Sequence, residues 1–224
     1  MKGIRGLILT LAAALAIGVP AQAAPITLTG GTAGSIPGGV GLNDFIPGLF
    51  PGPQIGGYFG TRIDLAVPVQ STILVEFFGA EAGFHNEFNF FGSELFDHPG
   101  GTIIAPNLGA PLGSFLTTIV GSGVMPFSFD VNSDAGSVAN GANPDDTGGA
   151  AAGPNFFATC NPFSGAAGAG GTTCSSVYLF LDDGGAGPDD NHDDFLVRVT
   201  VPEPATLGLV GLGLLGLAAR RFRN

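Results

Sequence analysis

The sequence predicts an all-β protein, an antiparallel β-sandwich of the jelly-roll type, and three observations point to it. Short runs rich in β-branched and aromatic residues recur between clusters of Gly, Pro, Asn and Asp. No segment between the two ends of the chain shows a convincing 3.6-residue hydrophobic period, and 39 glycines disfavour long helices there. The 19 phenylalanines supply the core volume that the absent tryptophans cannot.

Seven runs fit strands. In the last of them, apolar residues at every second position alternate with Leu196, Arg198 and Thr200, which is typical of a strand with one buried face. Residues 24–57 are rich in Gly and Pro, so we expect them to be partly irregular. In chain order the predicted strands are Thr61–Val67, Thr72–Phe78, Glu87–Phe91, Phe115–Val120, Val124–Val131, Val177–Leu181 and Phe195–Val201.

The first 23 residues have the pattern of a secretory signal peptide. Lys2 and Arg5 precede an apolar run, residues 7–19, and Ala21 and Ala23 provide the small residues of a signal-peptidase site. The mature chain is therefore expected to begin at Ala24.

The other end combines proline punctuation, an apolar run and basic residues. Two prolines bracket Glu203 and end any preceding strand, since each lacks a backbone donor. The uncharged run 205–219 would form a helix about 22 Å long at about 1.5 Å per residue, a short transmembrane span if the terminal arginines extend to the cytoplasmic interface. The predicted organisation is a signal peptide at 1–23, a secreted β-domain at 24–201 and a sorting segment at 202–224.

This order of PEP motif, single hydrophobic span and terminal basic cluster closely resembles the C-terminal sorting signal of PEP-CTERM proteins. The resemblance implies that a membrane-embedded exosortase recognises the tail and removes it. It also implies that the exported domain reaches the surface or matrix of bacteria that make exopolysaccharide. The residues of the sorting motif are Val201, Pro202, Glu203, Pro204, Arg220, Arg221 and Arg223.

The predicted mature domain is strongly acidic. Of the 18 acidic residues of the chain, only Glu203 lies outside residues 24–201, and of the 7 basic residues only Arg62 and Arg198 lie inside. Nucleic acid requires a basic footprint, so it is excluded as a partner of the folded domain. Cations are favoured instead.

Cys160 and Cys174 predict a structural disulfide, because an even number of cysteines in an exported chain favours pairing. The bridge would close the loop between them, worth about 3 kcal/mol in the chain-entropy model. A metal pair is the weaker alternative, since the spacing is far longer than C-x₂₋₄-C and no histidine lies nearby.

The segment 182–194 predicts a calcium site, because six aspartates and one asparagine crowd there. Such crowding is unfavourable unless a cation neutralises it, and calcium takes six to eight oxygen ligands. Asp189, Asn191 and Asp193 have the D-x-N-x-D spacing that begins an EF-hand loop, although Thr200 stands where the bidentate Glu belongs. A solvated acidic turn that binds nothing stays an open alternative. The predicted calcium ligands are Asp182, Asp183, Asp189, Asn191, Asp193 and Asp194.

Three other segments carry weaker signals. Asp145 and Asp146 fit a turn at 143–148 that could supply a remote calcium oxygen. His85 and Glu87 match the H-x-E of zinc deaminases, but the P-C-x-x-C partner is missing. His98 precedes Pro-Gly and fits a surface histidine in a turn.

The function predicted is that of an exported, non-enzymatic protein of the cell surface or exopolysaccharide matrix, stabilised by calcium. Its partners would be exosortase and the membrane during sorting, then exopolysaccharide or other surface proteins. Jelly rolls also host glycoside-cleaving sites, so a polysaccharide-active enzyme or a carbohydrate-binding module is the alternative. The absence of Trp and the presence of only 2 Tyr leave few platforms for sugar rings.

Overall fold

The computed structural model describes residues 25–37, 43, 50, 53–67, 71–104, 110–119, 121–132, 136–168, 171–184 and 191–202. These belong to one compact unit, residues 24–202. The predicted signal peptide and the predicted transmembrane helix lie outside the described residues. Within the described residues, no helix has the length and apolar character needed to cross a membrane.

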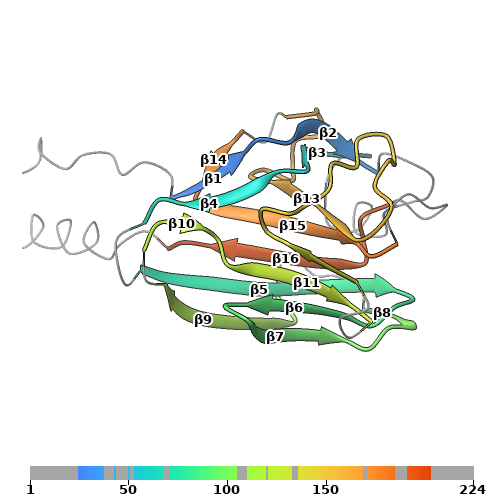
Figure 1. The fold of residues 1–224 in the computed structure, drawn as a ribbon, viewed down its shortest axis with the longest axis horizontal. Coiled ribbons are helices and arrows are strands. Elements are labelled where there is room, and N and C mark those ends of the chain that lie inside the picture. The colour runs from blue at the N-terminus through green and yellow to red at the C-terminus, as the bar shows by residue number, and fades with distance from the viewer. Residues whose placement is uncertain are drawn as a thin grey trace, which may run out of the picture. The chain divides into compact units, whose positions relative to one another are not determined.

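The described part of the chain is built of antiparallel strands joined by turns (Figure 1). Every strand pair that the structure shows is antiparallel, which confirms the predicted all-β class. The strands are β1 (Ile26–Thr29), β2 (Thr32–Ile36), β3 (Ile55–Phe59), β4 (Arg62–Leu65), β5 (Ser71–Ala82), β6 (Asn86–Phe90), β7 (Ser93–His98), β8 (Thr102–Ile104), β9 (Gly113–Ile119), β10 (Gly123–Val124), β11 (Phe127–Val131), β12 (Gly136–Ala139), β13 (Asn155–Thr159), β14 (Thr173–Cys174), β15 (Ser176–Asp182) and β16 (Phe195–Thr200).

The strands form one large sheet and two smaller ones. The large sheet has the order β2-β3-β13-β15-β16-β5-β8, and β9 pairs with the first part of β5. The smaller sheets have the orders β10-β4-β1-β14 and β12-β11-β6-β7. Figure 1 shows β15, β16 and β5 side by side in the large sheet, where β16 pairs with both of the others.

The large sheet is apolar on both faces. Along β15, Val177, Leu179 and Leu181 enter a core shared with strands of both smaller sheets, while Tyr178 and Phe180 enter a second cluster. Successive side chains of a strand point to opposite faces, so one strand supplies both clusters. This packing is consistent with the predicted sandwich, whereas the jelly-roll connectivity stays a prediction.

Each predicted strand overlaps an observed one, but the boundaries differ. Predicted strand Val124–Val131 is two strands, β10 and β11, because Pro126 cannot donate to a ladder between them. β5 continues four residues beyond its predicted end, to Ala82, since its later half pairs with β8. Residues 24–57, expected to be partly irregular, contain β1, β2 and the first part of β3; β1 pairs with β4 and β14, and β2 pairs with β3.

Candidate functional site

The described ends of the acidic segment turn into the protein interior. Asp182 ends β15 and is fully buried, and Asp193, just before β16, is 1% exposed. This burial disfavours the alternative of a solvated turn at these positions. Asp189, one of the predicted calcium ligands, lies outside the described residues. The predicted ligands that the structure describes are all buried: Asp182, Asp183, Asn191, Asp193 and Asp194.

A carboxylate from a distant part of the chain joins them. Asp146 lies in the loop between β12 and β13, and it is 1% exposed. Its Oδ2 lies 4.0 Å from His192 Nε2, and Asp182 Oδ2 lies 4.0 Å from His192 Nδ1. One donor atom from each of these three residues lies within 4.8 Å of the others. We call Asp146, Asp182 and His192 the inner cluster.

His192 is held in a fixed orientation within this cluster. Its Nε2 lies 2.8 Å from Asn155 Oδ1, an amide oxygen that can only accept, so Nε2–H is the donor. The other ring nitrogen, Nδ1, then carries the lone pair on the side of Asp182. The ring also packs edge-on against Phe59 and Phe157. Burial lowers the pKa of His192 to about 3, so the imidazole is neutral at physiological pH.

Asp183 and Asp194 form a second pair beside the inner cluster. The backbone N–H of Asp183 donates to Asp194 Oδ2 at 2.8 Å, and Asn86 Nδ2 donates to Asp183 Oδ2 at 2.7 Å. Burial, and then the nearby charge of Asp183, raise the pKa of Asp194 to about 9. Asp194 is therefore protonated at neutral pH, which lowers the repulsion within this pair.

Neither arginine of the domain forms an ion pair with Asp146, Asp182 or Asp194 in the described structure, since each is engaged elsewhere. Arg62 forms an ion pair with Asp64, with a nitrogen–oxygen distance of 3.0 Å. Arg198 binds Glu76 at 2.7 Å and donates to the Tyr178 hydroxyl. Residues 24–201 contain no lysine. Within the described residues, neither arginine therefore contributes positive charge to this group of carboxylates.

A second group with potential ligand atoms lies on the surface. His85 contacts Asp97 across the β6–β7 hairpin and lies 3.5 Å from Glu87. Glu87 and Asp97 are directly opposite each other in the strand register. These side chains are partly exposed, and exposed pairs of this kind contribute little on their own. His98, predicted at the surface, is instead buried and hydrogen-bonded to the Thr102 carbonyl.

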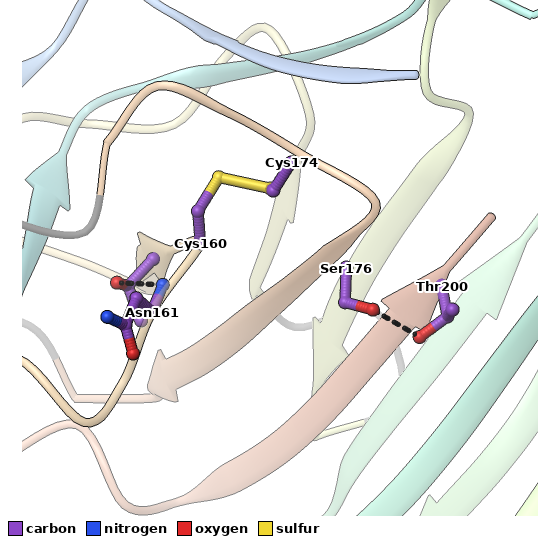
Figure 2. Close-up of a disulfide and its surroundings, with 6 residues drawn as sticks. Cys160, Asn161, Cys174, Ser176 and Thr200 are labelled. Carbon is purple, nitrogen blue, oxygen red and sulfur yellow. Dashed lines mark hydrogen bonds between the residues drawn. A yellow bond between two sulfur atoms is a disulfide. The ribbon is translucent and has the colours of Figure 1, made fainter. Parts of the chain in front are cut away.

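Cys160 and Cys174 form a disulfide, as predicted, with their Cα atoms 5.7 Å apart (Figure 2). Cys160 follows β13, and Cys174 belongs to β14, where it pairs with Ile26 of β1. The bridge therefore links the large sheet to one of the smaller sheets. Figure 2 also shows the Ser176–Thr200 hydrogen bond, which joins β15 to β16 at 2.9 Å.

Comparison with known proteins bears on the C-terminal segment. A family model described as the PEP-CTERM protein-sorting motif matches residues 200–223, which include all of the predicted sorting residues. Neither the curated proteins nor the solved structures gave a match. The chain thus combines an all-β antiparallel domain with a C-terminal sorting signal. It carries a PEP-CTERM motif, which implies export and processing by an exosortase at the membrane.

Sequence reasoning found part of the inner cluster. It placed Asp182 among the ligands and named Asp146, together with Asp145, only as a source of a remote oxygen, while His192 and Asn155 were missed. Asn155 pairs with Asp182 in the register of β13 and β15, and this pairing cannot be seen without the sheet topology. A histidine inside a run of aspartates was the one signal in the sequence that could have pointed to His192.

Proposed function

We propose that this chain is an exported, non-enzymatic β-domain that exosortase processing delivers to the cell surface or the exopolysaccharide matrix. The match of residues 200–223 to the sorting motif carries the proposal. The strand β16 ends at Thr200, and the N–H of Val201 still donates to the Ser175 carbonyl. Pro202 is exposed. Cleavage beyond Pro202 would therefore leave the strands of the domain intact.

The inner cluster and the Asp183–Asp194 pair together form what we call the acidic centre. Its burial supports a structural role for it. Asp182 and His192 are fully buried, and Asp183 is 9% exposed. A polymer substrate contacts side chains that line an open cleft, whereas Asp182, Asp183 and His192 are buried. The centre is better suited to holding the chain together than to acting on a polysaccharide.

Calcium is part of the proposal as the ion that stabilises the acidic centre. Carboxylates and amide oxygens dominate the centre, and these are the ligands that calcium takes. The two arginines of the domain are engaged with Asp64 and Glu76. A calcium ion bound among the buried carboxylates would offset their mutual repulsion.

The sorting part of the proposal is tested by the double variant Glu203→Ala/Pro204→Ala in the native host. We expect the unaltered chain in the surface or released fraction without its tail, and the variant in the membrane fraction with its tail. Glu94→Ala, on β7, is the control for loss of an acidic residue and should sort normally. Identical distribution of the double variant and the unaltered chain would refute the proposed route.

A further inference from the structure

Asp146 carries a buried carboxylate oxygen that receives no hydrogen bond from the described residues. Its Oδ1 accepts from the backbone N–H of Ala151 at 2.6 Å, whereas its Oδ2 has no hydrogen-bond partner in the part of the chain that the structure describes. The residue is 1% exposed, so solvent does not replace the missing donor. Burying a charged oxygen without compensation is strongly unfavourable. An ion at this position would supply the compensation.

The surroundings of Asp146 Oδ2 fit a metal site. The His192 Nε2 atom lies 4.0 Å away, beyond hydrogen-bond distance, and its N–H donates to Asn155 Oδ1 at 2.8 Å. Asp182 Oδ2 lies 4.0 Å from the other ring nitrogen. Asn155 accepts from the His192 ring, which is how proteins commonly orient a histidine that binds metal through its other nitrogen.

We propose that Asp146, Asp182 and His192 together hold one divalent metal ion inside the domain. The inference rests on the proposal that a cation neutralises the acidic centre, and it deepens that proposal by naming the ligands. Only Asp182 is shared with the ligand set predicted from the sequence. The ion would tie the loop before β13 to the end of β15 and to the segment that leads into β16.

The donor set indicates which ions the site prefers. Two carboxylates and one imidazole combine the ligands of hard cations with a ligand suited to zinc and other transition metals. Calcium takes oxygen ligands almost entirely. We therefore expect Mn²⁺ or Zn²⁺ to bind the inner cluster at lower concentration than Ca²⁺.

The test uses the full-length chain in detergent, first stripped of metal with a chelator. Equilibrium dialysis against Mn²⁺, Zn²⁺ or Ca²⁺ counts the bound ions, and thermal unfolding reports stabilisation. We expect one ion per chain at the inner cluster and a rise of several degrees in the unfolding midpoint. Asp146→Asn should weaken binding by more than about tenfold, as expected for loss of a charged ligand. Asp145→Asn removes the same charge from the exposed neighbouring residue and should leave binding unchanged.

The unfolding midpoints of the metal-free proteins show whether Asp146 is a metal ligand or a residue that only supports the fold. Asp146→Asn keeps an oxygen for the Ala151 N–H and removes a buried charge, so without metal its midpoint should equal or exceed that of the unaltered chain. A lower midpoint both with and without metal would mean that Asp146 is only structural, and would overturn the inference.

The remaining outcomes distinguish the inference from the proposal on which it rests. Equal binding by the unaltered chain and Asp146→Asn would overturn the ligand assignment and leave calcium stabilisation standing. Binding of Ca²⁺ without binding of Mn²⁺ or Zn²⁺ would overturn the assignment of His192. No response of the unaltered chain to any of the three ions would overturn both the inner cluster and the calcium part of the proposed function.

Discussion

Arg198 connects three residues on one face of the large sheet. Its guanidinium donates to Glu76 Oε2 on the neighbouring strand and to the Tyr178 hydroxyl, and it lies 4.9 Å from the centroid of the Phe78 ring. Arg198 and Glu76 are directly opposite each other in the register of β16 and β5. The sheet register therefore fixes the pair, in which the Glu76 side chain is buried and the Arg198 side chain is partly exposed.

Replacing Arg198 should destabilise the domain because the Glu76 carboxylate, 8% exposed, would remain buried without its partner. We expect Arg198→Met to lower the free energy of unfolding by about 3 kcal/mol, the lower end for breaking a buried pair. Arg62→Met, which removes a half-exposed arginine from its pair with Asp64, should change it by less than about 1 kcal/mol. Denaturant unfolding measures both. Equal effects of the two variants would contradict the buried-pair account.

For single residues, the sequence indicated which residue types form the candidate site, but it did not show which residues distant in the chain lie next to them. The density of aspartates in 182–194 predicted an unusual acidic centre, and the structure buries its described members. Asp146 joins Asp182 and His192 only through tertiary packing, and Asn155 does so only through the β13–β15 pairing. The spacing of these residues in the sequence predicts neither the cluster nor the strand pairing.

Among the elements, β14 is a strand of two residues that is held both by pairing with β1 and by the disulfide. Its Cys174 pairs with Ile26 of β1 and is covalently bound to Cys160, which follows β13. The loop between the two cysteines contains Gly165 and Gly168. Without the disulfide, this flexible loop would have more conformational freedom in the unfolded chain.

Replacing both Cys160 and Cys174 by Ala should lower the free energy of unfolding by about 2 to 4 kcal/mol, mainly by releasing the unfolded chain. Denaturant unfolding gives the value, and the unaltered chain under reducing conditions should match the double variant. Thiol labelling of the exported protein, denatured without reductant, should find no free thiol. Two reactive thiols in that experiment would contradict the disulfide.

A strand was easier to predict from the sequence when its pairing partner is also its neighbour in the sequence. β15 and β16 are neighbours in sequence and in the sheet, and their predicted bounds differ from the observed ones by one residue at each altered end. β1 was missed because its partners are β4 and β14, both distant in sequence, and Gly-rich surroundings mask its short apolar pattern. β13 was missed because it is buried on both faces and shows no alternation.

For the whole molecule, charge and topology together fit a protein that works outside the cell. Residues 24–201 contain 17 of the 18 acidic residues of the chain and only two arginines, a net negative charge that favours solubility of a phenylalanine-rich domain. The sorting motif overlaps the end of β16 by Thr200 alone and then continues past Pro202. Processing can therefore separate the sorting signal from the folded domain without removing a core strand.

Intact mass spectrometry of the protein from its native host tests whether the chain is exported and then processed at both ends. We expect a mature species that begins at Ala24, lacks most of the residues after Val201, and contains the Cys160–Cys174 disulfide. A mature species that still carries Arg223 at the cell surface would contradict it.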